Sequence, residues 1–238
     1  MRFLAFQKTV LPGRVHASMN DERSVDIIHL LHVLKREFVT VCKEARLSCA
    51  SALEQPCFVR LYRMNHQDHV RLLEKGIAET GGVWADFGSG AGAFTLALAD
   101  LIGPTGSIYS VDKDRGALKE QERAIRNNFP GTTVHYINAD FMQKLALPAL
   151  DGVVMANSLH FLRQKDAMLQ LVRSYLKPGG RLLVVEYNAD RGNMWVPYPF
   201  SYGTWEELAR KNGFSHTRLL ATVPSRFFDE IYSAISMG

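Results

Sequence analysis

Short runs of apolar residues alternate with longer amphipathic segments over most of the chain beyond residue 80. Glycine, proline or polar residues bound each run, as they bound strands buried in a sheet. The runs predict strands at 83–87, 107–111, 134–138, 151–157 and 176–186. The longer segments predict helices at 93–101, 114–129, 165–176 and 205–212. Strands that alternate with helices indicate a parallel sheet with helices on both faces.

Both ends of this pattern depart from it. Residues 65–76 predict one more helix before the first strand, ending near Gly76. Beyond residue 213, two strand-like stretches, 216–223 and 226–236, are separated only by Pro224 and Ser225. So tight a connection requires antiparallel pairing. The predicted fold is therefore α/β, a mostly parallel seven-stranded sheet with helices on both faces and a C-terminal antiparallel hairpin.

The first 63 residues do not share this organisation, and we predict a boundary between residues 63 and 64. Residues 24–53 contain an amphipathic pattern that predicts a helix with Ser24 as its cap. Three hypotheses fit the extension: translation that begins at Met64 instead, a helical cap or dimerisation arm, and a targeting segment. The main domain is then 64–238.

Charge and cysteine content narrow the class of protein. The chain of 238 residues has a formal net charge of +4, but from Met64 onward 18 basic residues balance 18 acidic ones. A neutral domain argues against a nucleic-acid partner, which usually needs a basic face. No apolar stretch approaches the roughly 20 residues of a membrane span. Cys42, Cys49 and Cys57 have neither zinc nor disulfide spacing, which favours a reducing cytoplasm.

The most informative segment is the loop after the first strand. Glycines stand at 88, 90 and 92, directly before a predicted helix. Glycine lets the backbone turn sharply and approach a ligand, and the amides at a helix start face that ligand. Asp112, 20 residues beyond Gly92, closes the second strand where an acid that binds ribose hydroxyls belongs. These features predict a cofactor that carries a nucleoside.

Two cofactor classes fit the loop. Gly88, Gly90 and Ala93 satisfy the G-x-G-x-x-G/A pattern of dinucleotide sites. Asp86, however, stands two residues before the first glycine, where it would repel a pyrophosphate and hold a cationic amino-acid moiety. This arrangement resembles the first motif of the Rossmann-like, class I S-adenosylmethionine-dependent methyltransferases. The later segments 134–141, 151–157 and 176–186 resemble the following motifs of that family in the same order.

The resemblance implies a set of cofactor-binding residues. In that family the first acid lies near the methionine end of S-adenosyl-L-methionine, the glycines pass beneath it, and the acid closing the second strand binds the ribose. An acid after the third strand accepts from the adenine amino group. Carried over, the set is Asp86, Gly88, Ser89, Gly90, Gly92, Asp112, Lys113, Asp140, Phe141 and Asn157.

Candidates for catalysis follow the fourth and fifth strands. Methyl transfer mainly requires two reactants held in line, plus a base where the acceptor is protonated. His160 is the first candidate for that base, because its ordinary pKa lies near neutrality. Glu186 and Tyr187 complete the predicted catalytic set. For His160 a helix cap, and for Glu186 a buried acid bonded to loop amides, are the competing interpretations.

Two further segments permit more than one interpretation. The stretch 187–200 is rich in aromatic and proline residues, which fits either an acceptor pocket or a loop packed on the sheet edge. His66 and His69 share a helix face, which fits a polar lid, surface histidines or a metal pair. A third metal ligand of matching spacing is missing, so we predict no metal.

The sequence thus predicts a cytoplasmic methyltransferase acting on a small molecule. An Asn/Asp-Pro-Pro-Tyr/Phe motif does not follow the fourth strand, which argues against nucleobase and glutamine amino groups as acceptors. The acceptor atom and the oligomeric state stay open. The alternatives are a nicotinamide-dependent oxidoreductase, which Asp86 and the hairpin disfavour, and a cofactor-binding module without turnover.

Overall fold

The computed structural model describes residues 64–225 and 227–238. The predictions made for residues 1–63, including the helix in 24–53 and the three cysteines, lie outside the described residues. None of the helices in the described ranges is both long enough and apolar enough to cross a bilayer.

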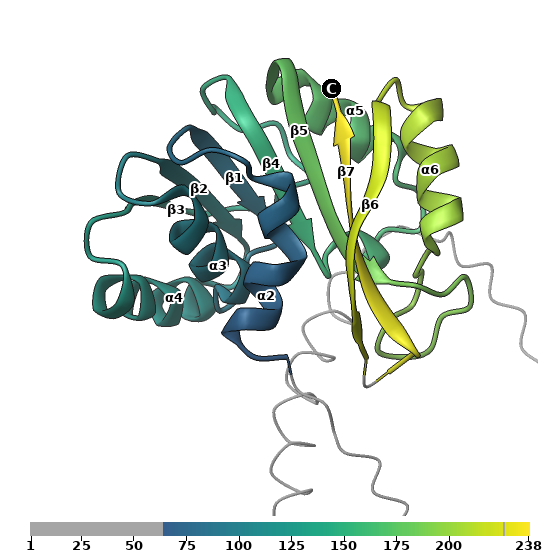
Figure 1. Cartoon of the computed structure of the whole chain (residues 1–238), viewed down its shortest axis with the longest axis horizontal. Coiled ribbons are helices and arrows are strands. Elements are labelled where there is room, and N and C mark those ends of the chain that lie inside the picture. The colour runs from purple at the N-terminus through teal and green to yellow at the C-terminus, as the bar shows by residue number, and fades with distance from the viewer. Residues whose placement is uncertain (1–63, 226) are drawn as a thin grey trace, which may run out of the picture. The chain divides into compact units, whose positions relative to one another are not determined.

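A single mixed sheet organises the described residues (Figure 1). It contains seven strands in this part of the chain, in the order β3-β2-β1-β4-β5-β7-β6. The strands β1 to β5 run parallel, whereas β7 pairs antiparallel with both β5 and β6. Their bounds are β1 Val83–Phe87, β2 Ser107–Asp112, β3 Thr133–Asn138, β4 Leu150–Ala156, β5 Leu176–Tyr187, β6 Ser215–Pro224 and β7 Glu230–Met237. The predicted fold class is confirmed.

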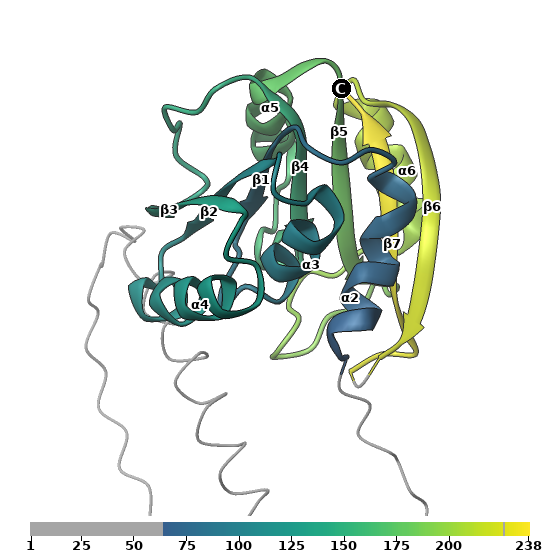
Figure 2. The ribbon, with the colours of Figure 1, turned by 60° about the vertical axis from the view of Figure 1, so that its left-hand side comes forward.

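Helices cover both faces of the sheet, as the alternating pattern predicted (Figure 2). One apolar core joins the sheet to three helices, α2 His66–Leu73, α3 Ala93–Ile102 and α4 Arg115–Asn128. A second core, on the other face, joins it to α5 Asp166–Tyr175 and α6 Tyr202–Lys211. The short helices η2 Glu74–Gly76 and η3 Leu159–Phe161 follow α2 and β4. Side chains along each strand point alternately to the two faces of the sheet and so contribute to both cores. In β1, Trp84 belongs to the first core and Phe87 to the second.

Polar caps explain where the helices begin. The Asp114 carboxylate accepts from the amides of Gly116 and Ala117 and starts α4. The Ser201 hydroxyl accepts from the Thr204 amide, so α6 begins three residues before the predicted start at 205. Because side chains at the cap satisfy amides that have no partner within the helix, such residues stabilise a helix start by about 1 kcal/mol.

One other detail of the predicted pattern was wrong, namely the length of the hairpin turn. The connection between β3 and β4, residues 139–149, contains no helix, and the sequence pattern placed none there. Leu145 and Leu147 pack this loop against the second core, so it covers the sheet as a helix would. The hairpin turn spans residues 225–229 instead of two residues, and the Ser225 amide donates to the Asp229 carbonyl at 3.1 Å.

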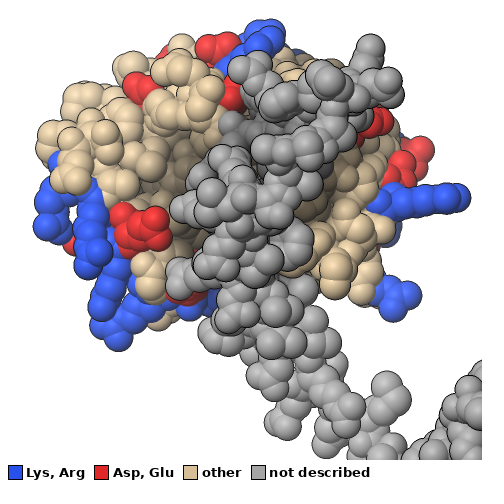
Figure 3. Space-filling model, turned by 90° about the horizontal axis from the view of Figure 1, so that it is seen from below, with Lys and Arg blue, Asp and Glu red and all other residues tan. Residues whose placement is uncertain are grey.

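The sheet brings all predicted site segments to one edge. The carboxyl ends of β1, β2, β4 and β5 point downwards in Figure 1, and ligands of open parallel sheets bind at such ends. Figure 3 views that edge and shows Lys and Arg side chains gathered where α4 lies. The exposed basic residues there are Lys113, Arg115, Lys119, Arg123 and Arg126, interleaved with the acids Glu120 and Glu122.

Candidate functional site

The glycine loop runs from the end of β1 to the start of α3, and three of its residues adopt left-handed backbone angles. Gly88, Gly90 and Gly92 have φ values of 78°, 53° and 89°, a region that favours glycine. A Cβ on Gly92 would stand 2.3 Å from Cγ of Gln121. Nothing lies within 4 Å of the position that a Cβ on Gly90 would take. The loop therefore packs tightly against α4 at one glycine and borders open space at another.

Backbone bonds fix this loop to the neighbouring strand. The amides of Gly88 and Ser89 donate to the Val111 carbonyl at 2.9 and 3.2 Å. Gly92 caps α3 without any side-chain hydrogen bond, so the first amides of α3 are available to a ligand. An uncapped helix start behind a glycine turn suits a polar or anionic group.

Asp86 lies beneath the loop in the core. Its side chain is buried and accepts a hydrogen bond from the Thr95 hydroxyl at 2.6 Å. Burial raises the pKa of the Asp86 carboxyl to about 7, with the Thr95 bond opposing and nearby Asp112 reinforcing the rise. A buried carboxylate without a cation is costly, so this position favours a positively charged ligand group.

Asp112 joins the end of β2 to the glycine loop. One carboxylate oxygen accepts from the Gly90 amide at 2.7 Å and the other from the Asp114 amide at 2.7 Å. The side chain is only partly buried, and the neighbouring Lys113 is exposed. Each carboxylate oxygen has a second lone pair, so Asp112 can accept hydroxyl protons while it keeps both amides.

The residues after β3 and β4 meet beside the glycine loop. Phe141 lies parallel to Phe87, with 6.3 Å between ring centroids, and Asp140 accepts from the Met142 amide. A Cβ on Gly88 would stand 2.7 Å from Cβ of Ser158 and 3.2 Å from the Phe141 ring.

Asn157, at the end of β4, adopts φ 51°. Its Oδ1 and the Ser158 hydroxyl are buried without a hydrogen-bond partner. Buried polar atoms are nearly always satisfied in a functional state, so these two indicate a polar ligand.

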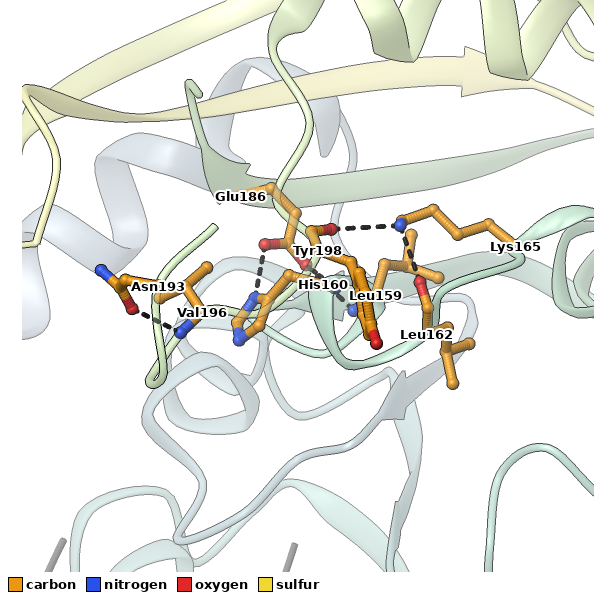
Figure 4. Close-up of polar contacts among 8 residues, drawn as sticks. All are labelled: Leu159, His160, Leu162, Lys165, Glu186, Asn193, Val196 and Tyr198. Atoms are coloured by element: carbon orange, nitrogen blue, oxygen red, sulfur yellow. Dashed lines mark hydrogen bonds and ion pairs between the residues drawn. The ribbon is translucent and has the colours of Figure 1, made fainter. Parts of the chain in front are cut away.

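The first two catalytic candidates form a buried pair (Figure 4). Nδ1 of His160 lies 2.7 Å from Oε2 of Glu186. The other oxygen, Oε1, accepts from the amides of Leu159 and His160 at 2.9 and 3.1 Å. Both side chains are buried. Glu186 is thus a buried acid bonded to loop amides, which was the competing interpretation, and its second oxygen contacts the His160 ring.

Tyr187, the third catalytic candidate, lies within reach of the pair. Its ring meets the His160 ring edge-on, with centroids 5.6 Å apart. Two aromatic rings of the hairpin turn, Phe228 and Phe227, lie 5.6 and 6.1 Å from the Tyr187 ring. The structure therefore brings the three predicted catalytic side chains together, and two aromatic rings of the hairpin turn contact one of them, Tyr187.

The loop 188–200 passes directly over His160. The Tyr198 amide donates to the His160 carbonyl at 3.0 Å. Asn193 turns the loop by accepting from the amides of Trp195 and Val196 at 2.8 and 2.9 Å. Val196 is buried, whereas Tyr198 is 43% exposed. The loop thus packs on the domain at some positions and presents side chains at others.

The histidines of α2 bind protein groups. His66 Nε2 lies 3.0 Å from an Asp100 oxygen, and the His69 ring meets Phe94 edge-on. Burial and then the neighbouring His66 lower the His69 pKa. Among the residues with described positions, no three potential metal ligands come together. A separate hollow of about 460 Å³ lies at the opposite edge of the sheet, between α5 and the start of β5, and includes none of the predicted site residues.

Sequence reasoning missed two residues of the site. Thr95 holds Asp86, and Lys165 donates to the carbonyls of Leu162 and Tyr198 at 2.8 and 3.1 Å. Thr95 stands one turn inside the predicted helix, where its spacing from the glycines was a usable signal. Lys165 had none, because a lysine at a helix start is ordinarily exposed.

A glycine turn after β1, an acid after β2 and an antiparallel β7 beside β5 define a Rossmann-like cofactor-binding fold of the methyltransferase type. Solved structures confirm this fold. A "SAM dependent methyltransferase" from Aquifex aeolicus superposes with a TM-score of 0.57 at 20% identity, over 77% of this chain and 93% of that one. Phosphoethanolamine N-methyltransferase 2 of Haemonchus contortus gives 0.57 at 17% identity, over 72% and 52%.

Sequence comparison agrees with the fold. Residues 85–182 match a family model described as a methyltransferase domain. The ubiquinone/menaquinone biosynthesis C-methyltransferase UbiE of Pseudomonas aeruginosa is 32% identical over 111 residues, 46% of this chain and 43% of that protein. The enzyme of the same name from Pasteurella multocida is 32% identical over 105 residues, 43% and 39%. The chain spans less than half the length of these relatives.

Residues 85–182 therefore match a methyltransferase domain, and the described residues have the fold of solved S-adenosylmethionine-dependent methyltransferases. The cofactor of this class is S-adenosylmethionine, as the glycine loop and Asp86 predicted.

Proposed function

We propose that the chain transfers a methyl group from S-adenosylmethionine to a small-molecule acceptor, with His160 as general base. The His160–Glu186 pair carries this proposal, because it stands at the carboxyl edge beside the glycine loop. A cytoplasmic location, suggested by the cysteine pattern, is part of the same proposal.

The residues around the loop fit the cofactor. Asp86 offers a buried carboxylate for a cationic amino group, and Asp112 has lone pairs left for ribose hydroxyls. Asn157 Oδ1 and the Ser158 hydroxyl supply polar atoms that lack partners. When bound, S-adenosylmethionine supplies a methyl group made electrophilic by its positively charged sulfur. We assign Asp140 and Phe141 to the adenine end.

The His160 pair suits the removal of a proton from the acceptor. If Nδ1 carries the proton that Glu186 accepts, Nε2 of neutral His160 has a free lone pair. No described residue donates to or accepts from Nε2, and in Figure 4 it points away from Glu186. With the cofactor bound, the acceptor would form its bond to the methyl carbon as the carbon–sulfur bond breaks and S-adenosylhomocysteine leaves, and the acceptor's proton would pass to Nε2. Glu186 would then stabilise the imidazolium, and the burial of both side chains limits access of water to the pair.

Calorimetry on the full chain tests cofactor choice. We expect micromolar binding of S-adenosylhomocysteine and no binding of NAD. Asp86→Ala should weaken binding more than about tenfold, because the ligand cation loses its partner. Glu120→Ala, which removes an exposed acid of α4, is the matched control and should bind normally. NAD binding instead would favour the oxidoreductase alternative.

Turnover separates an enzyme from a binding module. Radiolabelled methyl transfer should be followed with phenols, an electron-rich hydroquinone, amines and arsenite. The names of the relatives from Pseudomonas and Pasteurella make the hydroquinone, with a ring carbon as acceptor, the first to try. His160→Gln should lower turnover by about a hundredfold or more while S-adenosylhomocysteine binding persists. Binding without turnover on any acceptor would favour the non-catalytic module.

A further inference from the structure

Lys165 is a buried lysine next to the proposed base. Its side chain stands at the start of α5 and is 8% exposed. The ammonium donates to the Leu162 carbonyl at 2.8 Å and to the Tyr198 carbonyl at 3.1 Å, and lies 4.9 Å from the centre of the Phe200 ring. Two carbonyls and an aromatic face thus contact the cation. Burying an ammonium costs free energy, so its retention calls for a compensating role.

The bonds of Lys165 connect the loop to the base. Tyr198 is bound on both sides of its backbone: its amide donates to the His160 carbonyl, and its carbonyl accepts from Lys165 (Figure 4). The Leu162 carbonyl, which shares the ammonium, lies two residues beyond His160. Lys165 therefore joins the loop 188–200 to the turn that carries His160.

The charge of Lys165 acts on the same pair. Glu186 is fully buried, and its electrostatic attraction partly opposes the fall in the Lys165 pKa caused by burial. Among the described residues, the ion-pair partner of Glu186 is His160, and Lys165 interacts with Glu186 electrostatically. Tyr232 on β7 also interacts with Glu186, as well as with Tyr202 on α6 and Asp190 in the loop. Burial raises the pKa of Tyr232, so its phenol stays neutral.

We propose that Lys165 is a positioning residue for His160, which holds the loop 188–200 over the base and offsets the charge of Glu186. This role rests on the proposed function. With the loop held, the acceptor meets the base in a fixed geometry.

Lys165→Met tests both parts of this role in the full chain. The Tyr198 amide should exchange with deuterium at least about tenfold faster, because the loop loses one of its two backbone ties. With the acceptor found above, KM should rise and kcat fall. The acid limb of the pH profile of kcat/KM should move to higher pH, because a missing cation makes protonation of the imidazole easier.

Two further variants separate position from charge. Lys165→Arg keeps the charge, so the acid limb should return towards that of the wild type, while the bulkier guanidinium leaves KM raised. Lys144→Met, which removes an exposed lysine, should change nothing. If Lys165→Met does not fold, Lys165→Gln replaces it, since an amide can still donate to one carbonyl.

The outcomes distinguish the two proposals. Folded Lys165→Met or Lys165→Gln with wild-type exchange at Tyr198 and a wild-type pH profile would overturn the role of Lys165. Wild-type protein that binds no S-adenosylhomocysteine would overturn the proposed function. Faster exchange at Tyr198 joined to a shifted acid limb supports the positioning role, because a purely structural residue would move the first without the second.

Discussion

At the scale of single residues, the site places two carboxylates in the core. Asp86 has one hydrogen-bond donor, Thr95, and no cation among the described residues within ion-pair distance. Glu186 has two amides and the His160 ring. The first arrangement leaves a charge for a ligand to neutralise, whereas the second is complete within the protein.

Asp86 should therefore cost stability in the absence of ligand. Its pKa rises from an ordinary 3.8 to about 7 on folding. The folded chain then holds this proton more tightly than the unfolded chain, so the free energy of unfolding falls as pH rises from about 4 to 7, by at most about 1.4 kcal/mol per pH unit. Asp86→Asn removes this penalty.

We expect Asp86→Asn to be more stable than the wild type at pH 8, by about 2 kcal/mol, and to differ little at pH 5. The gain is smaller than the full penalty because the new amide lacks a described acceptor. Urea unfolding at both pH values measures it. The same variant should bind S-adenosylhomocysteine more weakly. An equal stability difference at both pH values would contradict the assigned cause.

Glu186→Gln should separate orientation of the base from folding. The glutamine oxygen can still accept from some of the three donors, but its amide nitrogen must face another one. We expect turnover to fall about a hundredfold or more, with a stability loss of about 2 kcal/mol. Binding of S-adenosylhomocysteine should stay within about twofold in calorimetry. Tyr187→Phe retains the ring beside His160 and serves as the comparison variant. Wild-type turnover in Glu186→Gln would show that the His160–Glu186 pair has only a structural role.

The residue pattern of the site was only partly visible in the sequence. Glycine spacing and strand-end acids marked the loop because each obeys a local rule about backbone angles or strand position. The contact between His160 and Glu186 joins residues 26 apart, and the bond from Lys165 to Tyr198 joins residues 33 apart. Such contacts depend on which strands become neighbours, and local spacing does not contain that information. The sequence therefore indicated most members of the proposed site, but not Thr95 or Lys165 and not which residues pair.

At the scale of elements, the helices and strands with a regular hydrophobic period were those that the sequence predicted. The parallel strands and their helices were found because buried strands and amphipathic helices have different periods. The segment 139–149 has no such period, and it is held by contacts with distant residues, such as the hydrogen bond from the Leu145 amide to the Tyr175 hydroxyl at 2.7 Å. The hairpin was predicted correctly, but the predicted turn was too short. Aromatic residues 227 and 228 resemble strand residues in the sequence, whereas in the structure they belong to the turn and contact the Tyr187 ring.

The contact between β1 and β4 gives a test of element packing. Gly152 on β4 pairs with Trp84 on β1, and a Cβ at 152 would stand 2.2 Å from the Trp84 ring. Gly152→Ala should lower the free energy of unfolding by about 2 kcal/mol, because the ring cannot move within a packed core. Gly203→Ala, in α6 with nothing within 4 Å, should raise it by about 0.5 to 1 kcal/mol. Chemical denaturation measures both, and equal effects would contradict the packing argument.

At the scale of the whole molecule, one sheet lies between two apolar cores, and the carboxyl ends of its parallel strands carry the proposed site. The α2–α4 core holds Asp86 and the glycine loop, and the α5–α6 core holds Glu186 and Lys165. Both layers contribute to each set, since Phe141 packs against the α5–α6 core and Tyr187 belongs to the α2–α4 core. Every residue that we assign to either set stands beyond Met64.

This arrangement predicts that residues 64–238 are sufficient for cofactor binding. A chain beginning at Met64 should bind S-adenosylhomocysteine with the affinity of the full chain in calorimetry, because both cores and all assigned side chains remain. At a ligand concentration of about one hundred times Kd, both chains should gain about 2.7 kcal/mol of stability, since the ligand binds only the folded state. Equal affinity would leave residues 1–63 a role outside the cofactor site. If the shorter chain folds, with a cooperative thermal transition, but binds at least about tenfold more weakly, then residues before Met64 contribute to that site and the predicted domain boundary is wrong.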